Sequence, residues 1–305
     1  MNFVKTFGGS GADLAKGLAV DASSSNIYVT GSFAGTASFD PASNTNAAAK
    51  LTALGGGDAF LVKLNSSGVF AWARRWGGTD GNRDEGRAVV VDNTDPSGAS
   101  VYVAGYFLGA NVDLDPTAGS FVRSSLGGAD AFISKFKQSG AFVWSATAGS
   151  SGTERAYGLA LRPDHSIASV GQFNNTVDFN PSSTAQANLT AAMLDGFAWT
   201  LNSSGGFVSV QRLGSSGVDL VRGIASDKNG NLYVAGVFSS TLYVNATSIT
   251  SSGGKNLFVA RLPAPSAGVV LAAKAPSLST PAKPLAPTAP SSDAQDDYFT
   301  KLAED

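Results

Sequence analysis

The sequence predicts an all-β fold in which one unit of four strands recurs four times. Its 36 glycines, few charged residues and only two methionines suit short strands joined by many turns. A pair of strands recurs along the chain, and a strand that ends in glycine precedes each copy. These observations favour an all-β protein over a helical enzyme.

The strand pair is clearest at residues 58–78. Residues 59–64 are apolar apart from Lys63, residues 65–68 form a polar break, and residues 69–76 are β-branched and aromatic before two glycines. This pattern predicts a hairpin. Further copies lie at 130–144, 195–210 and 256–262, and the last copy stops before its second strand.

Two other landmarks complete the repeat. A strand ends in glycine at Gly31, Gly105, Gly171 and Gly236, and a small pair follows the last strand at Gly8-Gly9, Gly77-Gly78, Gly149-Ser150 and Gly214-Ser215. In the first repeat we expect strands at about 17–21, 27–33, 58–64 and 69–76. Four short antiparallel strands in each of four repeats predict a β-propeller of four four-stranded blades.

The two ends of the repeat region complement each other. Residues 3–9 resemble residues 71–78, which form the strand that the copy at 256–262 lacks. We therefore expect the N-terminal strand to close the last blade, which would leave no open inner edge. The domain spans 1–263, with repeats at about 10–78, 79–150, 151–215 and 216–263 plus 1–9. A fragment of a longer propeller is the alternative.

The C-terminal residues have a different composition. Residues 264–291 are rich in Pro, Ala and Ser, which predicts a disordered linker. Residues 292–305 begin with a capping box and place Tyr298, Phe299 and Leu302 on one helical side. They predict a short acidic amphipathic helix that could dock on a partner or serve as a sorting tag; a frayed terminus is the alternative.

Several motifs resemble one known family. DAFLVKL, FAWARRWGG, DEGRAVVVD, VYVAGYF and VDLDP resemble the bacterial beta-propeller repeat family, or SBBP repeats, over nearly all of 1–263. The resemblance implies a propeller in a surface or secreted bacterial protein, without catalytic residues. The family name implies seven blades, whereas four are counted here. Residues 193–197 and 168–171 depart from the family's pattern.

Composition excludes several functions. The net charge of -2, with no basic cluster longer than Arg74-Arg75, argues against nucleic-acid binding. The absence of cysteine excludes disulfides and thiolate metal sites. No apolar run reaches the roughly 20 residues of a membrane helix, and no signal-peptide core is visible. His165 is the one histidine, and no nucleophile elbow, phosphate loop or zinc-protease motif occurs.

Carboxylates recur before the first strand of each repeat. If the ring closes, Asp13, Asp84, Glu154 and Asp219 form a four-fold set at one mouth of the channel, where oxygen ligands could hold Ca²⁺ or Mg²⁺. Three residues after each acid stand Lys16, Arg87, Tyr157 and Arg222. Salt bridges and turn-capping hydrogen bonds explain the same acids without a ligand.

A second set of acids opens the long connections at 34–57, 108–129 and 174–194. Asp113 and Asp115 alternate along an extended segment before Pro116, which suits Ca²⁺. An Asx-turn stopped by proline is the structural alternative. Because binding residues concentrate on loops that a rigid scaffold holds, these polar connections predict a ligand-binding rim.

The sequence thus predicts a monomeric, non-catalytic binding or scaffold module, with calcium as the candidate metal. We expect it outside the cell or on its surface, with polar loops that contact a protein or a polysaccharide. Two alternatives stay open: a structural module of a surface assembly in which the tail docks, and a hydrolase that attacks polysaccharide with acidic rim residues.

Overall fold

The computed structural model describes residues 3–43, 45–245 and 247–264. All of them belong to the first of two compact units of the chain, Met1–Ala273. The regular secondary structure of the described residues is β-strand, apart from one short 3₁₀ helix, η1 (Ala47–Ala49). The linker and helix predicted after residue 264 lie outside the described residues.

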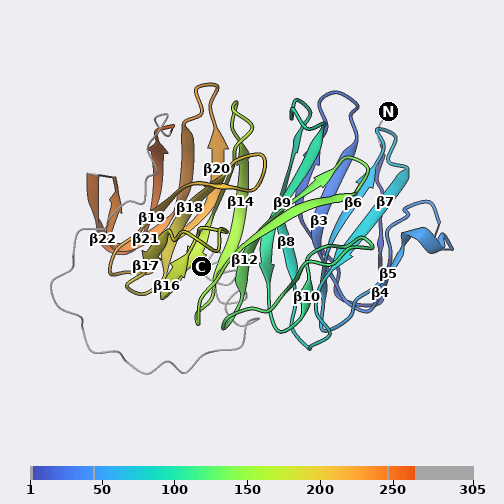
Figure 1. The fold of residues 1–305 in the computed structure, drawn as a ribbon, viewed down its shortest axis with the longest axis horizontal. Helices are drawn as coiled ribbons and strands as arrows, with labels where there is room; N and C mark the ends of the chain where they lie inside the picture. The colour runs from blue at the N-terminus through green and yellow to red at the C-terminus, as the bar shows by residue number, and fades with distance from the viewer. Residues whose placement is uncertain (1–2, 44, 246, 265–305) are drawn as a thin grey trace. The chain divides into compact units, whose positions relative to one another are not determined.

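Four antiparallel sheets follow one another along the chain (Figure 1). Sheet 1 contains β2 (Leu14–Val20), β3 (Ile27–Phe33), β6 (Asp58–Leu64) and β7 (Phe70–Trp76). Sheet 2 contains β8 (Glu85–Asp92), β9 (Ser100–Phe107), β12 (Asp130–Lys137) and β13 (Phe142–Ala148). Sheet 3 contains β14 (Arg155–Leu161), β15 (Ile167–Phe173), β18 (Asp195–Leu201) and β19 (Phe207–Leu213). Sheet 4 contains β20 (Leu220–Ser226), β21 (Leu232–Val244) and β22 (Thr247–Leu262).

The long connections predicted as loops fold into small hairpins. These are β4 (Thr36–Ser38) with β5 (Lys50–Thr52), β10 (Val112–Asp113) with β11 (Val122–Arg123), and β16 (Thr176–Asp178) with β17 (Asn188–Thr190). In sheet 4, β21 and β22 continue beyond the sheet and pair with each other in the same way. Phe39, Leu114 and Phe179 are buried in the core. The connections are therefore part of the packed structure.

Both faces of each sheet are apolar because sheets pack face to face. In β6, Ala59 and Leu61 pack toward sheet 2, whereas Phe60 and Val62 pack on the other face. A strand buried on both faces reads as a continuous apolar run, as DAFLVKL does. The first strands β2, β8, β14 and β20 lie next to one another in that order.

The expected ring closure is not found among the described residues. Residues 3–7 form no strand, and β1 (Gly8–Gly9) pairs with β4 rather than with β22. Sheet 4 accordingly has three strands instead of the predicted four. The first strand of sheet 1 also lacks a neighbour on one side, since Leu18 is 66% exposed. The described structure is therefore an open row of four sheets.

In the described ranges, no helix has the length and apolar character needed to cross a membrane.

Candidate functional site

The first strand of every sheet contains a β-bulge at the same place. The pairing register shifts between Ala15 and Gly17, Gly86 and Ala88, Ala156 and Gly158, and Val221 and Gly223. The extra residues are Lys16, Arg87, Tyr157 and Arg222. Because a bulge turns a side chain out of the ordinary alternation, four equivalent bulges present four side chains from equivalent positions.

These side chains join their neighbours in a ladder of cations and aromatic rings. The Arg87 guanidinium lies 5.4 Å from the Tyr106 ring and 5.3 Å from the Tyr157 ring. Arg222 lies 4.6 Å from the Tyr157 ring, and Arg155 lies 4.7 Å from the Tyr106 ring. Cation–π attraction holds such stacks together.

One carboxylate enters this ladder. Glu85 lies 2.9 Å from Arg87 Nε and 3.5 Å from Lys16 Nζ. Burial and the Glu85 charge raise the pKa of Tyr106, so its neutral hydroxyl donates to Glu85 at 2.7 Å. We call the set of Lys16, Glu85, Arg87, Tyr106, Arg155, Tyr157 and Arg222 the cationic row. Its charged groups are four cations and one carboxylate, and the outermost cations, Lys16 and Arg222, are exposed.

The carboxylates predicted as metal ligands accept hydrogen bonds that connect neighbouring sheets. Asp84 accepts hydrogen bonds from the backbone N–H of Gly78, at 3.0 Å, and of Leu108, at 2.9 Å. Gly78 follows the last strand of sheet 1, whereas Leu108 opens the connection of sheet 2. The same first contact recurs from Gly9 to Asp13, Ser150 to Glu154 and Ser215 to Asp219. Each acid therefore fastens its sheet to the strand that precedes it.

The four carboxylates do not gather into a ring of ligands. Each lies at its own junction, and the described residues contain no group of three or more His, Cys, Asp or Glu side chains that could hold a metal ion. The nearby basic residues Lys16 and Arg87 form ion pairs with Glu85 and not with the acids three residues before them. The hydrogen bonds that these acids accept from backbone N–H groups agree with the turn-capping alternative.

Sequence reasoning missed a second carboxylate at each of the three junctions between neighbouring sheets. A Cβ placed on Gly214 would lie 2.5 Å from Asp195 Oδ1 and 2.7 Å from Asp219 Oδ2, so both acids lie against one glycine. Asp58 with Asp84 and Asp130 with Glu154 form the corresponding pairs. The Asp that opens each DAF or DGF copy was the available signal for these residues.

Burial changes the acidity of these pairs. Burial raises the pKa of Asp84, Asp130, Glu154 and Asp195 to about 7. The charge of the neighbouring acid adds to the rise at Asp84, Glu154 and Asp195. Two close buried carboxyls resist losing both protons, so the acid pairs at the three junctions between neighbouring sheets favour the protonated form of one carboxyl up to about pH 7.

The Asp-x-Asp residues form turns within their hairpins. Asp113 Oδ1 accepts the backbone N–H of Asp115, at 3.0 Å, and of Phe121, at 2.8 Å. Asp115 Oδ1 accepts both the backbone N–H and the hydroxyl of Thr117. Asp178 accepts two backbone N–H groups of its own hairpin in the same way. These contacts match the Asx-turn alternative.

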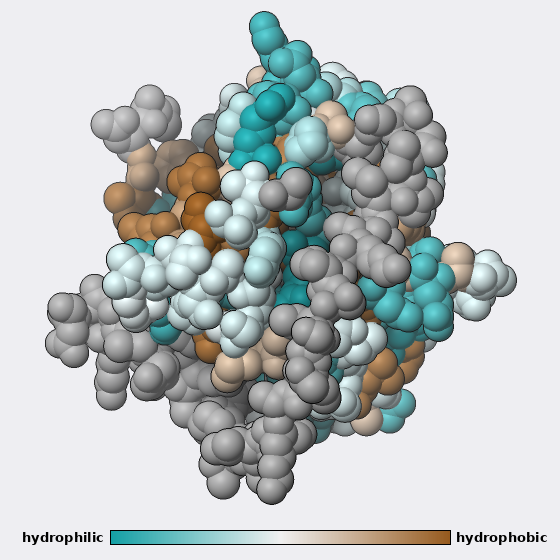
Figure 2. Space-filling view, turned by 90° about the vertical axis from the view of Figure 1, so that its left-hand side faces the viewer, coloured by the Kyte–Doolittle hydropathy of each residue, from teal (hydrophilic) through white to brown (hydrophobic). Residues whose placement is uncertain are grey.

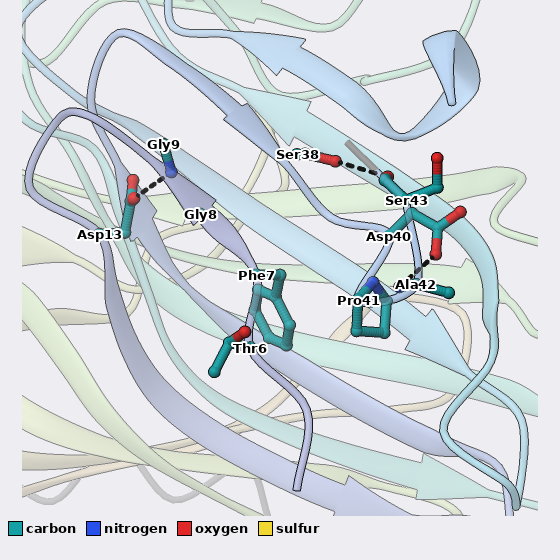
Figure 3. Close-up of a pocket in the computed structure, with 10 residues that line it drawn as sticks. All are labelled: Thr6, Phe7, Gly8, Gly9, Asp13, Ser38, Asp40, Pro41, Ala42 and Ser43. Atoms are coloured by element: carbon teal, nitrogen blue, oxygen red, sulfur yellow. Dashed lines mark hydrogen bonds between the residues drawn. The ribbon is translucent and has the colours of Figure 1, made fainter. Parts of the chain in front are cut away.

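One hollow brings the two predicted sets of acids together. At sheet 1, a hollow of about 660 Å³ is bordered by Asp13 from the first set and by Asp40 from the connection, with Phe7 between them (Figure 3). A hydrogen bond from Asn46 lowers the pKa of Asp40. At the other junctions the neighbouring sheet's third strand places a carboxyl against the corresponding glycine. The hollow therefore marks an open junction.

Comparison with known families supports the repeat assignment. Residues 210–237, from β19 into β21, match a family model described as SBBP: Beta-propeller repeat. No curated protein matches the chain. The matched segment contains the first bulged strand of sheet 4, with Arg222, and the strand that ends at Gly236. Residues 210–237 are therefore similar to a beta-propeller repeat of the SBBP family.

Proposed function

We propose that the four sheets are blades of a β-propeller that serves as a non-catalytic binding module, and that the cationic row holds an anionic polysaccharide. The observation that carries the proposal is the set of four equivalent bulges, which aims Lys16, Arg87, Tyr157 and Arg222 into one row. Lys16 and Arg222, the exposed cations of the row, suit a polymer whose acid groups repeat along its length, whereas the inner cations Arg87 and Arg155 are largely buried.

The environment of the acids supports a non-catalytic role. A glycosidase needs two carboxyl groups that flank the scissile bond, one of them as an acid and the other as a base or nucleophile. Asp113 and Asp178, which lie in the connections predicted as a ligand-binding rim, each accept two backbone N–H groups and shape their hairpins. A surface or extracellular location, where polysaccharides occur, is part of the same proposal and rests on the family resemblance.

Binding of the full chain to a polyuronate, measured by titration calorimetry, tests this proposal. We expect binding that weakens as salt rises, and no binding to a neutral glucan. Arg222→Gln removes an exposed cation of the row and should weaken binding by roughly tenfold or more, since a charge-assisted hydrogen bond is worth about 1.5–3 kcal/mol.

Lys228→Gln is the matched control, because it removes the same charge from an exposed turn outside the row. Equal losses in Arg222→Gln and Lys228→Gln would show that net charge rather than the row binds the polymer. Polyuronate binding that is absent even at low salt would refute the proposed ligand. Cleavage of the polymer that disappears in a folded Asp113→Ala variant would favour the hydrolase alternative.

A further inference from the structure

Residues 3–9 pack on sheet 1 in the way that a last strand packs on the sheet that follows it. The Phe3 ring lies against Gly68, where an added Cβ would be 2.8 Å from it. Gly68 lies in the turn between β6 and β7. At the following sheets, Trp72 of β7 lies against Gly140 and Trp144 of β13 lies against Gly205, and a Cβ added to either glycine would be 3.0 Å from the ring.

The two glycines at the end of this segment, Gly8 and Gly9, also pair as the residues after a last strand do. Gly8 and Gly9 pair with β4, as Gly77 pairs with Asp113 and Gly214 with Tyr243 in the later hairpins. Gly8 and Gly214 share an unusual backbone, with φ of 147° and 154°. Residues 3–9 thus occupy the place of a last strand whose own sheet would precede sheet 1.

Sheet 4 shows the complementary gap. Among the described residues, no strand pairs with the outer edge of β22. Leu257 is 83% exposed and Val259 is 77% exposed, although their equivalents in sheet 1, Ala59 and Leu61, are fully buried against sheet 2. Figure 2 looks onto the side where β22 lies and shows hydrophobic surface there. Sheet 4 therefore presents a face built to pack against a following sheet.

The matching face belongs to β2. Leu18 and Val20 are 66% and 54% exposed. Their equivalents in β8 are Val89, which is buried between sheets 1 and 2, and Val91, which packs against the same core. One molecule thus carries both halves of a sheet junction, one at each end of its row.

We propose that sheet 4 of one chain docks on sheet 1 of a second copy, and that residues 3–7 of the second copy form the missing last strand beside β22. The register follows from sheet 1, in which Ala59, Leu61 and Lys63 lie opposite Trp76, Arg74 and Trp72. By this register Leu257 lies opposite Phe7, Val259 opposite Lys5, and Arg261 opposite Phe3.

Polar groups at this junction are also complementary. Lys63 and Lys135 donate to the carbonyls of Gln138 and Ser203 in the next sheet's turn, at 3.2 Å and 2.8 Å. Arg261 holds the same position in sheet 4 and would donate to the carbonyl of the equivalent turn residue of the second copy, Ser66.

The acid pair is altered at the same junction. Asn256 stands in the place of Asp58, Asp130 and Asp195. It would lie beside Gly8 and Asp13 of the second copy, next to the hollow of Figure 3. An amide can donate to the Asp13 carboxylate, so this junction forms without a shared proton.

A second copy satisfies both ends at once. Within one chain the two complementary faces are exposed together, so its own sheet 4 does not cover sheet 1. Two copies related by a two-fold axis would cover both exposed faces of each copy, in a closed ring of eight sheets. This assembly departs from the monomer expected from the sequence.

Cysteine trapping tests the register, because the chain has no cysteine of its own. A full-length Lys5→Cys chain is mixed with a full-length Val259→Cys chain and oxidised mildly. We expect a disulfide-linked heterodimer of about twice the 30.9 kDa chain mass. Val4→Cys mixed with Val259→Cys is the control, since a slip of one residue places the side chains on opposite faces of the sheet.

Light scattering on the unmodified chain gives an independent measurement. We expect a dimer that Val259→Lys converts to a monomer, whereas Leu126→Lys leaves the mass unchanged, because Leu126 is 70% exposed in the β11–β12 connection. An internal disulfide in a monomeric Lys5→Cys/Val259→Cys variant would overturn the proposal in favour of closure within one chain. A monomeric mass at all concentrations, or equal trapping in the control, would also overturn it.

Discussion

The junction between sheets 2 and 3 and the exposed face of sheet 4 are built from the same repeat, but one is buried and the other is open to solvent. Ile133 of β12 is fully buried against sheet 3, whereas Val259, at the equivalent position of β22, is 77% exposed. Ala131 and Leu257 show the same contrast. An apolar strand pattern therefore makes burial favourable, but the side chains are buried only where a neighbouring sheet packs on them.

This contrast indicates that side chains buried between neighbouring sheets contribute much of the stability of the fold. Burying a large aliphatic side chain stabilises a fold by about 1.5–3 kcal/mol, and this contribution is unrealised where no neighbour is present. Repeat proteins share this dependence, because each unit is stabilised by its interfaces with adjacent units.

Truncation at equivalent positions should give the largest difference. Ile133→Ala should lower the free energy of unfolding by about 2–5 kcal/mol, because it leaves a cavity in the core. Val259→Ala should change it by less than about 0.5 kcal/mol in the monomeric chain. Urea unfolding at low protein concentration measures both values, and similar losses would contradict the contrast between junction and edge.

A methyl group on the first glycine of a junction should have an intermediate effect. Gly214→Ala places a Cβ against two buried carboxyls at a φ of 154°, so we expect a loss of about 2–4 kcal/mol. Gly8→Ala meets Asp13 alone among the acids, and Asp13 is half-buried and borders an open hollow. A loss nearer 1 kcal/mol is expected there. Thermal unfolding of both variants tests this order, which equal losses would refute.

The smallest effect concerns the pH dependence of the junctions. The Asp130 carboxyl keeps its proton up to about pH 7 in the folded chain but loses it near pH 4 when unfolded. The folded state binds more protons between these values, so the free energy of unfolding should fall as pH rises from about 4 to about 7. Asp130→Asn should remove part of this fall and be more stable than the original chain above pH 7.

Asp40→Asn is the control for the pH experiment. The pKa of Asp40 is lowered, so its carboxylate form favours the folded state and its replacement should reduce stability at neutral pH. Unfolding midpoints at pH 5 and pH 8 separate the two variants. A stability of the original chain that rises over this range, together with no gain from Asp130→Asn, would contradict retained protons at the junctions.

Local pattern determined much of the fold. The strands predicted at 27–33 and 58–64 occur with those bounds, because strong apolar runs between turn residues leave little choice of secondary structure. The repeat predicted a further sheet each time it recurred, and the match of residues 210–237 to a beta-propeller repeat model supports the repeat assignment there. The sequence also located Asp13, Asp84, Glu154 and Asp219 at equivalent positions.

Only the tertiary structure decided what those positions do. Asp84 contacts Gly78 and Leu108 because strands from two sheets meet there, and no spacing along the chain reveals that meeting. The bulges that form the cationic row, and the packing of Phe3 on Gly68, depend on partners in other strands. Hydrophobic periodicity is a local property of the chain, whereas ring closure and acid pairing depend on which sheets become neighbours.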